Sequence, residues 1–231
     1  MKSSSHNFSV PAVELVPASA ASAGWARLLG SCTRAAVVVM LVSGVAYPLA
    51  TTGVAQLSMP QAANGSLVLR NGQIVGSALI GQQFDSAPYF HGRPSATTAP
   101  DPQKEGSTMA APYNAGLSGA SNQGATHKDL AETVAQRVAQ YRTDNGLAAD
   151  AKVPVDAVTA SASGLDPHIS VANAELQLPR VAQARGLAPA QLRGLLAQAT
   201  EQRTGFLLGE PRVNVLRLNL ALDALQQPAK E

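Results

Sequence analysis

The sequence is poor in charged residues, aromatic residues and cysteine, and each deficit excludes a class of protein. Charged residues make up 14% and aromatic residues 4% of the chain, so a core must be built from Ala, Val, Leu and Ile. The net charge of +2, without any run of Lys or Arg, argues against nucleic-acid binding, which needs a dense basic surface. The one cysteine, Cys32, can form neither an intramolecular disulfide nor a thiolate metal site.

The common signatures of metal and nucleotide chemistry are also missing. The four histidines are far apart and lack the HExxH spacing, so we expect no bound metal and no covalently bound cofactor. Neither a GxxxxGKS or GxxxxGKT phosphate loop nor a DKTG phosphorylation motif occurs. We therefore predict that the chain is not an enzyme by itself, and that any ATP hydrolysis takes place on another chain.

Charge is absent altogether between Ala35 and Leu69. The first part of this segment, Ala35 to Leu57, would reach roughly 35 Å as a helix, against a hydrocarbon core of about 30 Å. Arg27 and Arg34 precede it, and the next basic residue is Arg70. Positive charge next to the N-terminal side places that side in the cytoplasm.

These observations predict three regions. We expect a largely disordered cytoplasmic tail at residues 1–34, a transmembrane helix at 35–57, and an extracytoplasmic domain at 58–231. The alternative is a signal peptide cleaved after the small residues that end at Ala55, although its leading region would be long for that purpose. With a retained helix or a cleaved signal peptide, the domain is exported; the two alternatives differ only in whether it stays tethered to the membrane.

The exported part reads as an α+β (mixed α/β) domain. A hairpin is predicted at Leu67–Gly76, because Asn71-Gly72 suits a type I′ turn, and its second strand is expected to run on to Phe84. Asp85–Ala125 is crowded with turn-forming residues and is expected to be a binding loop or a disordered one. Further strands are expected at 153–159 and 213–216. Helices are expected at 128–145 (between Thr126 and Gly146), 171–185 (with a break or kink at Pro179), 189–203 and 219–225.

Several polar residues of the loops are candidates for a site. Ser163, Asp166 and His168 suggest a catalytic trio, but three residues so close in one loop rarely converge as a Ser–His–Asp triad does. A tight turn explains them better. Ser118 and Asn122 lie in a Gly/Ser loop that could bind an anion through its backbone, and Arg93 could bind a carboxylate or phosphate. A flexible loop and a loop-fixing salt bridge remain the simpler explanations.

Five stretches, taken in order, resemble the KdpC family, whose members are C subunits of the Kdp potassium-transporting P-type ATPase. They are GSALIGQQFDSAPYFHGRPSAT (76–97), YNAGLSGASNQG (113–124), VPVDAVTASASGLDPHIS (153–170), LQLPRVAQARGL (176–187) and GEPRVNVLRLNLALDAL (209–225). The last stretch adds Asn214 and Asn219 to the candidate interface or loop-structuring residues.

The resemblance implies an accessory subunit of a high-affinity potassium pump in the bacterial inner membrane. Its partners would be a potassium-channel-like subunit and a P-type ATPase subunit, which handle potassium and ATP. For the family it is proposed that this subunit raises the affinity of the pump for ATP through a glutamine, and Gln177 would be that glutamine here. A domain outside the membrane cannot touch cytoplasmic ATP, so we favour assembly and stabilisation at the outer mouth. A membrane-anchored hydrolase and a small-molecule-binding domain remain the alternatives.

Overall fold

The computed structural model describes residues 24–226, which fall into two units that part after Ser58. The first unit is a helix made of α1 (Trp25–Leu41), the π-helical turn η1 (Val42–Ala46) and α2 (Tyr47–Ser58). The turn η1 ends two residues before Pro48, which has no N–H to donate. Such wide turns often accommodate a broken helical ladder.

This helix is the one candidate membrane span among the described residues. It covers 34 residues, and its most apolar window has a mean hydropathy of 1.8. It begins at Trp25 rather than Ala35, so the residues before Ala35 that were assigned to the tail are helical from Trp25 onward. Residues 1–23, the rest of the predicted tail, lie outside the described part of the chain.

The second unit opens with the short helix α3 (Pro60–Ala63) and the predicted hairpin of β1 (Leu67–Arg70) and β2 (Gln73–Ser77). Arg70 pairs with Gln73, and Asn71 and Gly72 have φ values of +52° and +79°, as the type I′ turn requires. The expected extension to Phe84 is wrong. The Ser77 hydroxyl accepts a hydrogen bond from the Leu79 N–H, which turns the chain away.

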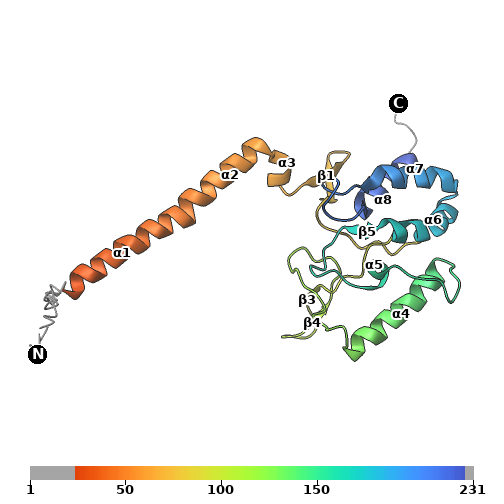
Figure 1. Ribbon diagram of the computed structural model, residues 1–231, viewed down its shortest axis with the longest axis horizontal. Helices are drawn as coiled ribbons and strands as arrows, with labels where there is room; N and C mark the ends of the chain where they lie inside the picture. The colour runs from red at the N-terminus through yellow and green to blue at the C-terminus, as the bar shows by residue number, and fades with distance from the viewer. Residues whose placement is uncertain (1–23, 227–231) are drawn as a thin grey trace, which may run out of the picture. The chain divides into compact units, whose positions relative to one another are not determined.

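Figure 1 shows α4 (Lys128–Asp144) on the opposite side of this unit from α7 and α8. The predicted helix at 128–145 is confirmed, with Gly146 following in a left-handed conformation, but His127 rather than Thr126 is its N-cap residue. The strand expected at 153–159 is wrong. Pro154 is the N-cap of a one-turn helix, α5 (Val155–Val158), since a proline has no N–H to give to a strand ladder.

The core lies where three helices meet a small sheet. The helices are α6 (Val171–Arg185), α7 (Pro189–Ala199) and α8 (Val215–Leu225), and the sheet has the antiparallel order β5-β7-β6. Its strands are β5 (His168–Ser170), β6 (Thr200–Glu201) and β7 (Arg212–Asn214). Fully buried Leu178, Leu192, Leu218 and Leu222 bring the three helices together.

The sequence-predicted boundaries shift here because strands and helices adjoin without loops. The helix expected at 189–203 ends at Ala199, where β6 begins, and the strand expected at 213–216 ends at Asn214. The last helix begins at Val215 rather than Asn219, because Asn214 accepts a hydrogen bond from the Arg217 N–H and caps it there. The helix at 171–185 is confirmed, but the break considered at Pro179 does not occur, because α6 continues through this residue.

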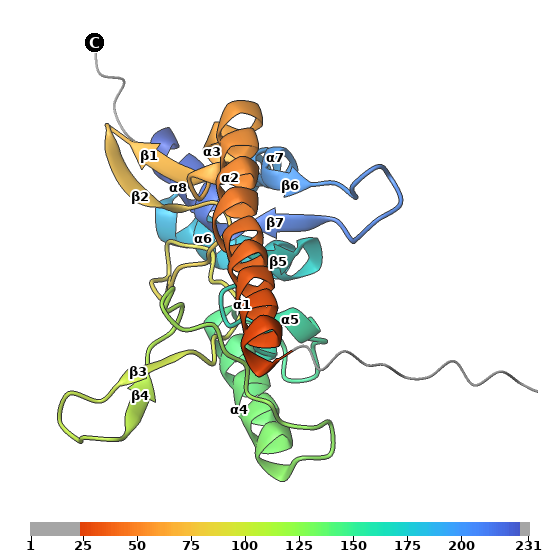
Figure 2. The ribbon, with the colours of Figure 1, turned by 90° about the vertical axis from the view of Figure 1, so that its left-hand side faces the viewer.

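The long loop at 85–125 contains a second hairpin, β3 (Thr98–Pro100) with β4 (Thr108–Ala110). Figure 2 shows this hairpin and the loop between β6 and β7 projecting from opposite sides of the second unit. The described residues are thus a mixed set of helices and small sheets, as predicted, together with the apolar helix.

Candidate functional site

Two buried amides hold one stretch of the long loop as a neighbouring strand would. The Phe90 N–H donates to Asn219 Oδ1, and Asn219 Nδ2 donates back to the Phe90 carbonyl oxygen, both at 2.9 Å. Gln177 does the same for His91, with distances of 2.7 and 3.1 Å. Consecutive residues of the loop are therefore fixed to α8 and α6, which buries the Phe90 ring in the core.

Gln177 has no hydrogen-bonding capacity left over. Its Oε1 also accepts from Arg180 Nη2 at 2.8 Å, and its Nε2 also donates to Asn173 Oδ1 at 2.9 Å. An amide offers two donors and two acceptor lone pairs, so all four are in use. The side chain is 1% exposed. The nucleotide link of Gln177 stays a prediction, and its contacts here are structural.

Asn214 joins the other buried amides as a loop-structuring residue. Its Oδ1 caps α8, and its Nδ2 donates to the Ala78 carbonyl oxygen at 2.8 Å, which ties the end of the first hairpin to the core. Asn214 and Asn219 were candidate interface residues, and each is 1% exposed. Their side chains therefore act within the domain in this structure.

Two arginines of α6 complete the attachment of the loop, and the sequence analysis assigned them no role. Arg180 donates to the carbonyl oxygens of Ala87 and Tyr89, and Arg185 donates to that of Pro88. The Arg185 guanidinium also lies 4.6 Å from the centre of the Tyr89 ring and pairs with Asp223 at 2.8 Å. In the sequence, the only hint of this role is that the two arginines lie five residues apart on a predicted helix, and that the loop contains neighbouring aromatic residues.

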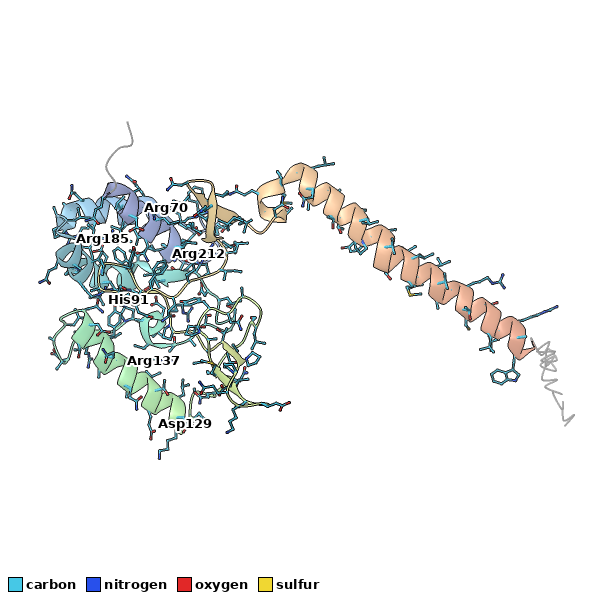
Figure 3. All side chains as sticks on the ribbon, turned by 180° about the vertical axis from the view of Figure 1, so that it is seen from behind. Arg70, His91, Asp129, Arg137, Arg185 and Arg212 are labelled. Atoms are coloured by element: carbon cyan, nitrogen blue, oxygen red, sulfur yellow. The ribbon has the colours of Figure 1, made fainter. Side chains whose placement is uncertain are left out.

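A cavity of about 320 Å³ lies beside this attachment, between the loop, α4 and α6. Figure 3 labels His91 between α6 and α4, and Arg137 on α4. The charged and aromatic side chains that line it are Phe84, Asp85, His91, Arg93, Tyr113, Arg137, Tyr141 and Asp144.

Burial controls the ionisation of the cavity wall. It lowers the pKa of His91, with a further lowering from Arg180, and it lowers the pKa of Arg137. Burial also raises the pKa of Tyr113 to about 12 and raises the pKa of Tyr141. The tyrosines are therefore neutral hydrogen-bonding groups. Tyr113 donates to the Arg93 carbonyl oxygen at 2.7 Å, and Tyr141 donates to Asn173 Oδ1 at 2.8 Å.

The structure brings Arg93, Asp166 and His168 together in a chain of charges. Arg93 Nη1 is 3.0 Å from Asp166 Oδ2, and His168 Nδ1 is 3.3 Å from Asp166 Oδ1. Burial alone would raise the pKa of Asp166, but hydrogen bonds from His168 and Arg93 outweigh it, and the pKa is lowered. The chain continues from His168 Nε2 to Glu201 Oε2 at 3.4 Å.

Ser163 stays outside this chain. Its hydroxyl accepts from the Leu165 N–H at 3.1 Å and lies 3.4 Å from the Ser161 hydroxyl, so it serves the local turn. Because both nitrogens of His168 already face carboxylates, neither is directed at a serine nucleophile. The arrangement fits a structural ion-pair chain and not a hydrolase triad.

The remaining candidates structure the loop at 113–124. Ser118 donates to the Ser163 carbonyl oxygen at 3.1 Å, and the backbone of Asn122 has a left-handed φ of +53° at an exposed position. Within residues 24–226, no group of three or more His, Cys, Asp or Glu side chains could hold a metal ion.

The chain matches a family model described as KdpC: K+-transporting ATPase, c chain, over residues 29–224. It is similar to proteins named Potassium-transporting ATPase KdpC subunit. That of Rhodopseudomonas palustris (strain ATCC BAA-98 / CGA009) is 55% identical over 195 residues, which cover 83% of this chain and 96% of the relative. Those of Methylobacterium nodulans and Bradyrhizobium diazoefficiens are 55% identical over 189 residues and 53% identical over 194. These matches cover 82% of this chain and 92% and 95% of the relatives.

Proposed function

Because the chain belongs to the KdpC family and is a subunit of a K+-transporting ATPase, we propose that it assembles and stabilises the pump without catalysing any step itself. The observation that carries the proposal is the family match over nearly the whole described chain, which takes in both the apolar helix and the domain. The sequence supports the non-catalytic role, because it has neither a phosphate-binding loop nor a phosphorylation motif.

The partners follow from what a single apolar helix cannot do. One helix cannot by itself surround a path for a hydrated ion, so other chains must supply the transmembrane route and the site of ATP hydrolysis. A potassium-channel-like subunit and a P-type ATPase subunit are the partners that the family resemblance implies. ATP and potassium are handled by that complex, and any effect of Gln177 on ATP would be transmitted through it.

The distribution of arginines supports the orientation, because they lie at the N-terminal end of the helix and none lies at its other end. Arg27 and Arg34 lie in the N-terminal part, and no basic residue follows until Arg70. The positive-inside rule then supports a cytoplasmic N-terminus and a domain outside the inner membrane.

A domain deletion tests the proposal. A chain that retains residues 1–58 but lacks 59–231 should fail to recover the pump from detergent-solubilised membranes, or should lower its potassium affinity. Full transport by cells that carry only residues 1–58 would contradict the assembly role.

Single-cysteine labelling tests the orientation separately. With Cys32→Ser as the background, Gln103→Cys in the exposed β3–β4 hairpin should react with a membrane-impermeant maleimide in intact spheroplasts. Reaction only after lysis would place the domain in the cytoplasm.

A further inference from the structure

The loop between β6 and β7 ends in a closed apolar tip. Thr204 and Leu208 exchange both backbone hydrogen bonds, at 2.9 and 3.0 Å, and enclose Gly205, Phe206 and Leu207. Below them, Arg203 Nη2 and Glu210 Oε2 form an ion pair at 2.6 Å across the base of the loop. The tip is therefore a built hairpin end with a defined shape.

Three consecutive large apolar side chains of this tip face solvent. Phe206 is 90% exposed, Leu207 is 84% exposed and Leu208 is 71% exposed. Phe206 also has a left-handed φ of +66°, a conformation that L residues with side chains avoid. The described part of the domain gains no packing from these side chains, and contiguous exposed apolar groups of this kind mark contact with a partner or a membrane.

The base of the tip is polar and carries an excess of positive charge. Arg212 and Arg217 both pair with Glu201, at 3.0 and 3.4 Å, and Arg203 pairs with Glu210. Three arginines thus stand against two glutamates. An apolar end followed by these arginines matches the order of layers at a bilayer surface, where phosphate groups lie outside the acyl chains.

The chain connection keeps the domain close to such a surface. The apolar helix ends at Ser58 and β1 begins at Leu67, so residues 59–66 span at most about 28 Å even when fully extended. We propose that Phe206, Leu207 and Leu208 insert into the interfacial layer of the bilayer and form a second, reversible membrane contact of the domain. This inference depends on the helix being a membrane anchor.

A lipid surface fits the tip better than a protein partner does. A stable protein interface buries about 800 Å² on each partner, which is far more than three side chains at the end of a narrow loop can supply. A bilayer requires no complementary pocket, and the tether supplies its high local concentration.

Depth-dependent fluorescence quenching tests the insertion in the full chain. Trp25→Phe removes the one native tryptophan, and Phe206→Trp then reports on the tip. Met109→Trp, in the hairpin on the opposite side of the domain in Figure 2, is the matched control. Tyr47→Trp, within the helix, reports on the anchor. Each variant is reconstituted in vesicles of phosphatidylcholine and phosphatidylglycerol, with and without bromine near the top of the acyl chains.

We expect bromine to reduce the emission of the Phe206→Trp variant about twofold and to leave the Met109→Trp variant nearly unchanged. Tyr47→Trp should be quenched to a smaller extent, because it lies deeper in the bilayer than the bromine. If Tyr47→Trp is quenched but Phe206→Trp is not, the proposed insertion of the tip is wrong, while the membrane anchor and the subunit role remain supported. Equal quenching of the Met109→Trp variant would also overturn it, because the domain would then lie on the bilayer without a specific contact. A third outcome would also overturn the insertion. If the emission of Phe206→Trp in the purified pump shifts to shorter wavelength but is not quenched by bromine, a protein surface covers the tip.

Discussion

At the scale of single residues, buried amides attach a chain segment that belongs to no sheet. Asn219 and Gln177 each give one donor and one acceptor to the backbone of Phe90 and His91. A carboxylate could not do this, because it lacks the donor, and an aliphatic side chain would leave buried backbone groups unpaired. The amide is therefore required by its chemistry as well as by its size.

Replacement of Asn219 by Leu should destabilise the domain by about 3 kcal/mol, because the N–H and carbonyl of Phe90 lose their partners inside the core. Urea unfolding of the detergent-solubilised chain, followed by circular dichroism, measures this. Gln136→Leu is the matched control on the exposed side of α4 and should change stability by less than about 0.5 kcal/mol. An equal effect of both substitutions would show that the amide pairing has no special role.

The pH dependence of stability should reflect Asp166. Its pKa in the folded chain is lowered from 3.8, since hydrogen bonds from His168 and Arg93 outweigh the opposing effect of burial. Asp166 therefore contributes to the free energy of unfolding at pH values above its pKa in the unfolded chain. This contribution is lost as the pH falls through its lower pKa in the folded chain. Asp166→Asn should be less stable than the native chain at pH 7, and the difference should shrink below about pH 4.

Unfolding free energies at several pH values test this, with Asp150→Asn as the exposed control. A constant difference between the native chain and Asp166→Asn from pH 7 to the acid limit would disprove the linkage.

At the scale of elements, the loops pack on one another and not only on the helices. Thr97 Oγ1 donates to the Ala111 carbonyl oxygen at 2.6 Å, and Ser95 Oγ donates to that of Gly164 at 2.7 Å. Gly164 permits this contact. It has a φ of +67°, and a Cβ there would lie 2.6 Å from both the Gly119 carbonyl oxygen and the Thr97 methyl carbon.

Gly164→Ala should therefore cost about 2 to 4 kcal/mol, because it adds a steric clash to the left-handed backbone. Gly186→Ala is a close control, since Gly186 has a similar φ of +63° but open space where its Cβ would lie. It should cost only about 1 kcal/mol. Thermal or urea unfolding compares the two, and equal losses would mean that the loops can separate freely.

At the scale of the whole molecule, an apolar helix and a polar domain share one chain. The helix has no acidic residue in its first turn and no basic residue in its last, and none of its residues is buried. Outside a membrane, its exposed Val and Leu side chains would remain in water. The anchoring of the chain should therefore depend on this helix.

Lysine at both Val39 and Val45 should weaken membrane retention, because each charge near the middle of a span costs about 3 kcal/mol. Carbonate extraction of membranes should then release much of this variant, while alanine at the same two positions should stay in the pellet. Retention of the lysine variant in the pellet, equal to that of the native chain, would mean that the helix is not what holds the chain to the membrane.

The amino-acid sequence by itself determined the family, the apolar helix, the first hairpin and the helices at 128–145 and 171–185. These features depend on local patterns: an uncharged run, an Asn-Gly turn, helical periodicity and ordered motifs. The family match confirms the resemblance. The strand expected at 153–159 failed because Pro154 starts a helical turn there, which an apolar run of that length cannot reveal.

Only the tertiary structure decided what the candidate residues contact. Gln177 and His91 are 86 positions apart, and Asn219 and Phe90 are 129 apart, so no local pattern could pair them. The partners of Arg180 and Arg185 could not be predicted either, because they are backbone carbonyl groups, which every residue carries. Ser163 stands apart from Asp166 and His168 because the turn uses its hydroxyl. Which residues distant in sequence form hydrogen bonds depends on how the core packs, and the packing of the core depends on the whole chain.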